Sequence, residues 1–175
     1  DSVNKAPLFP FGYGLGYTTF ALEDVQASVE GTAVTVQVQV RNTGSAPGKE
    51  VVQLYVSVPA GKLDQPYQAL AAFAKTEELA PGEAGEVLCS FALESLASFD
   101  SDTACSVLEA GDYLLRVGVS SRNTQVCGVV RLEEAIQVQQ LSSMGGQPDF
   151  EDWKPECEPY HSPDEEAQLA AAPLF

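Results

Sequence analysis

Several residue types are scarce in this chain of 175 residues, and each shortage excludes a class of function. Only nine Lys and Arg stand against 25 Asp and Glu, so the formal net charge is −16. That balance argues against nucleic acid as a partner, because phosphate binding needs clustered basic side chains, and it equally disfavours an anionic membrane surface. No apolar run approaches the roughly 20 residues that a helix needs to cross a membrane.

Cysteine is sparse as well, and its four positions are Cys89, Cys105, Cys127 and Cys157. No C-x-x-C spacing points to a zinc or redox site, and we expect neither a metal nor a cofactor. Cys89 and Cys127 fall in strand-like patterns, where a free cysteine behaves as a small apolar residue. Unpaired structural cysteines in a reducing compartment, a bacterial cytoplasm, are the favoured interpretation, with a disulfide framework as the alternative.

Side chains suited to catalysis are few. His161 is the only histidine, and it lies in an acidic stretch, residues 149–166, that holds eight acids and one base. A catalytic histidine must be held against a rigid nucleophile, so we expect a solvated surface residue. Asp100 and Asp102 form the nearest carboxylate pair, but a turn capped by aspartates is favoured over glycoside cleavage or a calcium loop. We therefore assign no catalytic residue.

The aromatic residues give little support for a flat sugar-binding platform. Trp153 is the only tryptophan and lies in a linker-like stretch, while Tyr55 and Tyr67 lie on or near expected strands. We expect these rings to pack within the protein or against neighbouring domains. The polar turn SSRN at residues 120–123 is either a simple hairpin loop or a place where Arg122 binds a carboxylate of an adjacent domain.

The clearest pattern in the chain is a period of two between residues 34 and 58. Apolar side chains occupy every second position of two segments: Val34, Val36, Val38 and Val40 in the first, Val52, Leu54, Val56 and Val58 in the second. This alternation predicts two β-strands, each with one apolar face. The sequence between them, NTGSAPG at residues 42–48, is rich in residues that end strands and form turns. Such a unit is typical of an antiparallel sandwich.

Five further segments show strand signals and bring the predicted number of strands to seven. They are residues 23–30, 68–76, 87–93, 113–119 and 125–132. Residues 95–99 favour a single helical turn, with Leu96 and Phe99 as buried plugs. Tyr113 follows a turn at the start of a late strand, as the tyrosine corner of immunoglobulin-like sandwiches does. The predicted fold class is all-β, a seven-stranded antiparallel sandwich of the immunoglobulin or fibronectin type III kind.

Three separated words resemble a known family. They are PLFPFGYGL at residues 7–15, NTGSAPGKEVVQLYVSVP at residues 42–59 and GVSSRN at residues 118–123. They are similar, in the same order, to segments of the fibronectin type III-like domain that glycoside hydrolase family 3 enzymes carry at their carboxyl side. The resemblance implies a sandwich over residues 20–138, preceded by a connector over residues 1–19 from an α/β sandwich domain, and followed by an acidic linker over residues 139–175.

The resemblance also implies a role. The family's nucleophile is an Asp of a barrel domain and its acid/base lies in the barrel or the α/β domain, and no matching motif is present here. The chain would be a non-catalytic structural accessory domain of a β-glucosidase-type enzyme that hydrolyses β-glycosidic bonds by the retaining route. Its partners would be the adjacent catalytic domains, with carbohydrate bound only through the parent. The alternative is a carbohydrate-binding module that targets the enzyme to polysaccharide.

The two ends differ in composition. Aromatic rings alternate with Pro and Gly near the amino end, at Phe9, Phe11, Tyr13 and Tyr17. We expect these rings to pack on a neighbouring domain or, in its absence, on the sandwich or a second copy. The acidic carboxyl end gains little by docking, so we expect it to be less ordered, most of all across residues 145–163.

A short helix is predicted near the carboxyl end, over residues 164–172. Ser162 would cap it, Pro163 would take its first position, and acids fill its first turn. In the family's rearranged domain order this segment would lead into a following barrel domain, and a disordered acidic tail is the alternative. The chain begins with Asp1 rather than Met, which predicts a fragment of a longer protein.

Overall fold

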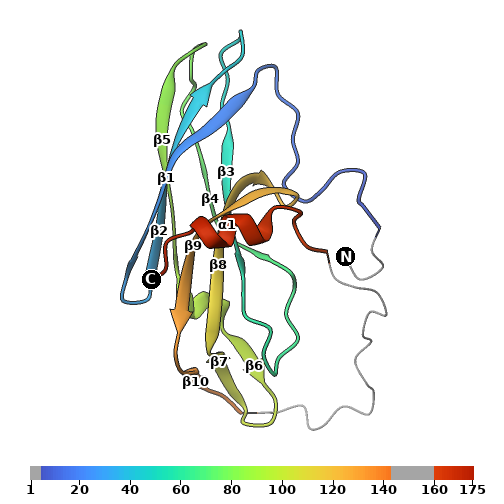
Figure 1. The fold of residues 1–175 in the computed structure, drawn as a ribbon, viewed down its shortest axis with the longest axis vertical. Helices are drawn as coiled ribbons and strands as arrows, with labels where there is room; N and C mark the ends of the chain where they lie inside the picture. The colour runs from blue at the N-terminus through green and yellow to red at the C-terminus, as the bar shows by residue number, and fades with distance from the viewer. Residues whose placement is uncertain (1–4, 143–159) are drawn as a thin grey trace.

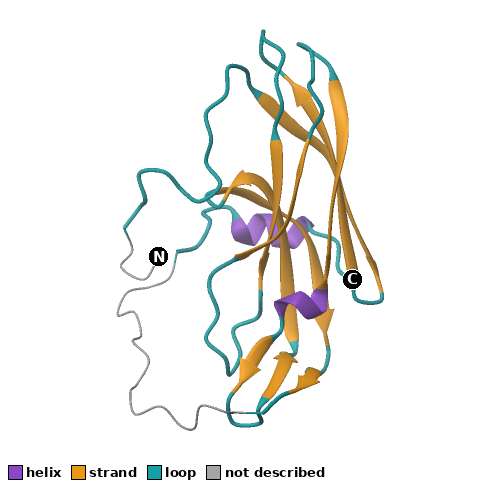
Figure 2. Ribbon diagram, turned by 180° about the vertical axis from the view of Figure 1, so that it is seen from behind, coloured by secondary structure: helices purple, strands orange, loops and turns teal. Residues whose placement is uncertain are grey.

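The computed structural model describes residues 5–142 and 160–175 as a sandwich of two antiparallel sheets, with a small third sheet at one end (Figures 1 and 2). The main sheets have the strand orders β1-β2-β5 and β4-β3-β8-β9. Their strands are β1 (Phe20–Glu30), β2 (Ala33–Asn42), β3 (Val51–Ser57), β4 (Ala69–Lys75), β5 (Ala84–Ala92), β8 (Gly111–Ser120) and β9 (Asn123–Leu132). These are the seven strands that the alternation predicts, so the all-β sandwich is confirmed.

Strand β2 lies at the centre of its sheet and supplies the middle of the core. Its four alternating valines, Val34, Val36, Val38 and Val40, are fully buried. They belong to one apolar cluster with Val52, Leu54 and Val56 of β3 in the opposite sheet. Burying each such aliphatic side chain stabilises the fold by roughly 1.5–3 kcal/mol. The predicted inward faces of both strands are confirmed.

Strand β3 is buried on both faces, although its alternation suggests one exposed face. On the outer face, Gln53, Tyr55 and Ser57 are nearly inaccessible. The Tyr55 hydroxyl donates to Gln53 Oε1 at 2.6 Å, and the Gln53 amide donates to the carbonyls of Gly12 and Val119 at 3.0 and 2.7 Å. Buried polar groups are tolerated when their hydrogen bonds are made. The outer face of β3 is therefore a covered polar layer.

The turn-rich word after β2 is organised by Asn42, whose side chain is fully buried. Its Oδ1 accepts hydrogen bonds from the Thr18 hydroxyl at 2.7 Å and the Gly44 amide at 3.0 Å. Its Nδ2 donates to the carbonyls of Ala46 and Leu79, both at 2.8 Å. A Cβ on Gly44 would lie 2.2 Å from the Thr18 hydroxyl oxygen, so only glycine fits. The loop needs these two residue types in this order.

A third sheet was not predicted. It consists of β6 (Ser98–Asp100), β7 (Cys105–Leu108) and β10 (Ile136–Gln140), in the order β10-β7-β6. Two of these strands are too short to show a period of two, and β10 crosses the expected domain boundary at residue 138. The folded unit therefore reaches past that boundary, because β10 pairs with β7.

The helical turn between the sheets begins two residues earlier than predicted, as a 3₁₀-helix at Leu93–Leu96. Leu93 is its buried residue, and Leu96 packs partly against the core. Phe99 lies in β6 and its side chain is exposed, so its expected role as a plug is wrong. Burial alternates along β6, so Phe99 faces outward while the next residue, Asp100, is buried and binds Lys62 and Thr103.

The tyrosine corner and the cysteines follow the predictions. The buried Tyr113 hydroxyl donates to the Glu109 carbonyl, four residues upstream, at 2.8 Å. Cys89 and Cys105 are buried, Cys127 is half-buried, and all three are free thiols. Cys157 lies outside the described residues.

The amino-terminal connector, residues 5–19, is held by its backbone while its rings stay exposed. The Phe11 carbonyl accepts from the Ser121 amide at 2.9 Å, and Gly12, at φ +78°, lies against Gln53 with no room for a Cβ. The exposed side chains are Leu8, Phe9, Phe11, Tyr13, Leu15 and Tyr17. The rings stay largely exposed, so they do not take the first of the two surfaces expected in the absence of a neighbouring domain, the sandwich itself; packing on a second copy stays a prediction.

The carboxyl end, unlike the connector rings, packs against the sandwich. Helix α1 (Glu165–Ala171) lies across strands β8 and β9 on the outer face of their sheet, and the last residues continue along β9 (Figure 1). Leu174 forms a parallel bridge with Val129. The expectation that this end gains little by docking is wrong for residues 160–175, since the end is fastened by hydrogen bonds rather than by apolar area. Residues 145–159 lie outside the described part of the chain.

The predicted short helix is confirmed, but its cap is different. Asp164 takes the N-cap position without a side-chain hydrogen bond, and the Ser162 carbonyl, not its hydroxyl, accepts from the Glu165 amide at 3.2 Å. In residues 5–142 and 160–175, no helix is long and apolar enough to span a membrane.

Candidate functional site

A cleft of about 780 Å³ lies over the outer face of β8 and β9. Its volume falls in the range of roughly 300–1,000 Å³ that is usual for small-molecule sites. Three elements enclose it, the loop between β3 and β4, the two strands, and the carboxyl end. Their main lining residues are Val58, Leu63, Tyr67, Asp112, Leu114, Arg116, Val129, Arg131, Glu165, Leu169 and Leu174.

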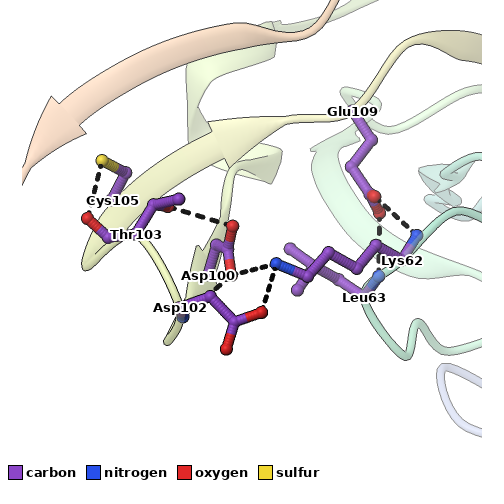
Figure 3. Close-up of polar contacts among 7 residues, drawn as sticks. All are labelled: Lys62, Leu63, Asp100, Asp102, Thr103, Cys105 and Glu109. Carbon is purple, nitrogen blue, oxygen red and sulfur yellow. Dashed lines mark hydrogen bonds and ion pairs between the residues drawn. The ribbon is translucent and has the colours of Figure 1, made fainter.

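The loop between β3 and β4, which forms one wall of the cleft, is held in place by hydrogen bonds to Glu109 (Figure 3). Its carboxylate accepts hydrogen bonds from the backbone amides of Lys62 and Leu63, at 2.7 and 3.2 Å. A carboxylate that binds consecutive amides fixes a loop without strand pairing. The wall is therefore preorganised in this chain.

Lys62 adds a second attachment to the same loop (Figure 3). Its Nζ lies 2.8 Å from Asp100 Oδ1 and 2.7 Å from Asp102 Oδ2. These hydrogen bonds raise the pKa of Lys62 to about 12, and the Lys62 contact lowers the pKa of Asp100. Asp100 also accepts from the Asp102 amide and the Thr103 hydroxyl. The prediction of a turn capped by aspartates is confirmed, and the pair forms an ion-pair network.

Arg116 forms the deepest part of the cleft floor. It comes from the centre of β8 and its side chain is 0% exposed. Its Nε donates to the Ser57 hydroxyl at 2.7 Å, and its Nη2 forms an ion pair with Glu165 Oε2 at 2.9 Å. The guanidinium also lies 4.8 Å from the centre of the Tyr67 ring, a cation–π distance. A buried cation is costly unless it is paired, so Glu165 is its essential counter-ion.

Tyr67 and Glu165 complete the charged group around Arg116. The Tyr67 hydroxyl donates to Glu165 Oε2 and accepts from the Ser162 amide at 3.1 Å. Burial, with the Glu165 contact, raises the pKa of Tyr67 to about 12. Burial alone would raise the pKa of Glu165, but the Tyr67 hydrogen bond and the Arg116 charge outweigh it and lower that pKa. Both groups therefore keep their ordinary charge near neutral pH.

The mouth of the cleft carries a second ion pair between β8 and β9. Arg131 donates to both oxygens of Asp112, at 2.7 and 2.8 Å. The contact lowers the pKa of Asp112. A general acid needs a raised pKa, so neither Asp112 nor Glu165 suits that role.

The remaining candidate residues occupy structural positions. His161 is exposed, as predicted, and its ring packs edge-on against Tyr67 at the cleft, with ring centres 5.7 Å apart. Arg122 lies in the β8–β9 hairpin turn, which is confirmed, and its guanidinium stacks 3.5 Å from the centre of the Tyr160 ring. Trp153 lies outside the described residues. Within residues 5–142 and 160–175, no group of three His, Cys, Asp or Glu could hold a metal ion.

The sequence analysis did not identify Arg116. Its strand reads as alternating, and an arginine at a polar position is usually solvated. Its burial depends on Tyr67 and Glu165, which lie far from it in sequence. The only available signal was a single cation inside the apolar word YLLRVGV.

Part of the sandwich matches a known domain family. The model of the fibronectin type III-like domain family matches residues 50–121, which run from the start of β3 to the β8–β9 turn. The sandwich is a fibronectin type III-like domain. The matched range excludes both the connector and the carboxyl end that closes the cleft.

Several relatives that this chain matches over part of their length are β-glucosidases. Beta-glucosidase A of Butyrivibrio fibrisolvens is 40% identical in a 155-residue alignment that covers 77% of this chain and 19% of that protein. A solved β-glucosidase of Paenibacillus barengoltzii aligns with a TM-score of 0.72 and 45% identity, over 78% of this chain and 16% of that one. The GH3 β-glucosidase of Bifidobacterium adolescentis gives 0.69 and 30%, over 81% and 22%.

The chain spans less than a fifth of the length of the curated relatives it matches. The resemblance to the fibronectin type III-like domain of glycoside hydrolase family 3 enzymes is confirmed by these matches.

Proposed function

We propose that the chain is a non-catalytic accessory domain of a family 3 β-glucosidase-type enzyme, and that it supports the adjacent catalytic domains. The parent would hydrolyse β-glycosidic bonds by the retaining route. Residues 1–19 would connect it to a preceding α/β sandwich domain, and residues 139–175 would lead toward a following barrel domain. Three free thiols support a reducing compartment such as the bacterial cytoplasm.

The connector carries this proposal. Its backbone is fixed to the sandwich by Phe11 and Gly12, yet its side chains point away from it. Phe11 is 66% exposed and Leu15 is 88% exposed. Several large exposed apolar side chains close together in sequence on a fixed backbone support a surface that another protein domain covers. Since relatives of this domain belong to much longer enzymes, the neighbouring catalytic domain is the natural occupant.

The test compares the chain alone with the full-length enzyme. Leu15→Ser and Tyr17→Ser should each lower the melting midpoint of the enzyme by several degrees, because buried apolar area is lost. The same substitutions should leave the chain alone unchanged. Leu88→Ser is the matched control, since Leu88 is similarly exposed on the opposite sheet. Equal effects of all three in the enzyme would contradict the assignment of the interface to the connector.

Two assays on the chain alone separate this role from the other candidates. No hydrolysis of a chromogenic β-glucoside is expected. Titration with cello-oligosaccharides should give no saturable signal, whereas binding in the micromolar range would favour a carbohydrate-binding module.

A further inference from the structure

Residues 160–175, which we call the carboxyl-terminal clasp, contact the sandwich at several separate places. The Tyr160 ring stacks on Arg122 of the β8–β9 turn, and the Ser162 amide donates to the Tyr67 hydroxyl. Glu165 pairs with the buried Arg116 at its beginning. Gln168 Oε1 accepts from the Val126 amide at 2.9 Å in its middle. Its last three residues add a short parallel strand to β9. The contacts differ in kind: an ion pair, a side-chain hydrogen bond and a strand pairing.

The first contact depends on one carboxylate. Arg116 is wholly buried and, among the described residues, its ion pair is with Glu165. The neighbouring Glu166 belongs to the same helical turn but is exposed. The surface therefore recognises a carboxylate at one position of the clasp and not acidity in general.

The last contact uses the free edge of β9. That strand already pairs with β8 along its other edge, and unpaired edges accept a further strand readily. The amides of Val129 and Arg131 donate to the carbonyls of Pro173 and Phe175, at 2.9 and 3.0 Å. The Phe175 amide donates back to the Val129 carbonyl at 2.9 Å.

The helix between these contacts cannot persist without them. Helix α1 has seven residues and none of them is fully buried. Isolated helices shorter than about 12–15 residues are marginal in water. Losing either end would therefore release α1, and with it the other end.

We propose that the outer face of β8 and β9 is a docking surface for a single segment, residues 160–175 of the same chain, which binds and leaves as one unit through the Glu165 carboxylate. Its release opens one wall of the cleft, because His161, Glu165, Leu169 and Leu174 leave together. The docking surface would recognise a segment with three features in order: a carboxylate that pairs with Arg116, one short helix, and a final strand that pairs with the edge of β9.

Amide hydrogen exchange of the full chain tests the proposal residue by residue. The amides of Val126, Val129 and Arg131 have their acceptors in the clasp. Glu165→Gln should speed exchange at all three by roughly tenfold, the effect of losing one charge-assisted contact. The amides of Val36 and Val38 should not change, which shows that the sandwich stays folded. Glu166→Gln is the matched control and should leave all five amides unchanged.

A second variant tests release as one unit. Gln168→Ala removes only the middle contact, yet it should speed exchange at Val129, Arg131 and Ser162 by a common factor. A change confined to Val126, or no change with Glu165→Gln, would overturn the proposal. Repeating the measurement at two protein concentrations roughly a hundredfold apart identifies the occupant. Protection that rises with concentration would assign the clasp to a second copy and overturn the same-chain assignment.

Discussion

Each end of this domain behaves differently from what its amino-acid composition suggests. The connector is rich in aromatic rings, yet it is held by backbone and threonine hydrogen bonds while Phe11 remains exposed. The clasp is acidic, yet Glu165 reaches a wholly buried arginine and Leu174 extends a sheet. Apolar content alone therefore does not decide which end docks. A specific counter-charge and a free strand edge decide it, since both leave an unsatisfied group when empty.

The largest expected effect comes from disrupting the hydrophobic core of the sandwich, to which both ends are attached. Val38→Asp places an unpaired charge in the middle of the core, where Val38 is 0% exposed. The cost is several kcal/mol, comparable with the ~5–15 kcal/mol that stabilises a small domain. Circular dichroism should show an unfolded chain at 25 °C. Gln37→Lys, on the other face beside Glu86, is the control, and a Val38→Asp protein that melts within a few degrees of the original would contradict the core assignment.

A smaller effect is expected where the connector joins the sandwich. Asn42→Ala removes four hydrogen bonds, two of them to the connector-side Thr18 and the buried Leu79 carbonyl. Leaving buried partners unsatisfied should lower the free energy of unfolding by about 2–4 kcal/mol. Urea denaturation measures this loss. Thr19→Ala, which breaks only an exposed hydroxyl contact to Thr43, should change stability far less. Equal losses would contradict the conclusion that Asn42 organises this loop.

Acid should release the clasp while leaving the connector alone. The pKa of Glu165 is lowered in the folded chain, so its contribution is complete above the ordinary value of 4.5 and is lost as the pH falls through the lowered value. Arg116, Tyr67 and His161 are the groups that face this carboxylate. Protection of the Val129 amide, corrected for intrinsic rates, should be constant above the ordinary value of 4.5 and should fall as the pH drops below it.

Glu165→Gln is the control for this pH dependence. Its Val129 protection should already be low and should not vary across the same range. If protection in the variant still falls with acid, another carboxylate controls the clasp.

The smallest effect is expected at the connector rings of the chain alone. Tyr17→Ser should change the free energy of unfolding by less than about 0.5 kcal/mol, as surface substitutions usually do, because the Tyr17 side chain is fully exposed. Differential scanning calorimetry would detect more. A destabilisation of about 2 kcal/mol would mean that the ring packs on the sandwich after all.

The sandwich was predictable from sequence because its information is local. Alternation at Val34 to Val40 and at Val52 to Val56 specifies the faces of two strands, and Tyr113 after its turn specifies the corner. The sheet of β6, β7 and β10 was not predictable, since its strands are short and β10 pairs with β7, which lies far away in sequence. The cleft was not predictable because its charged group comes from distant segments. Arg116 and Glu165 each read as an ordinary surface residue and Tyr67 as a packing ring without a specified partner, and only the tertiary structure brings the three together.

The parallel course of residues 173–175 along β9 has a mechanical consequence. A pull on Phe175 along the direction of β9 would load its three hydrogen bonds with Val129 and Arg131 at the same time, in shear. A pull perpendicular to the strand would break these hydrogen bonds one after another. The end of the clasp should therefore resist force strongly in one direction and yield easily in the other, with the Arg116–Glu165 contact meeting the load only after the strand has parted.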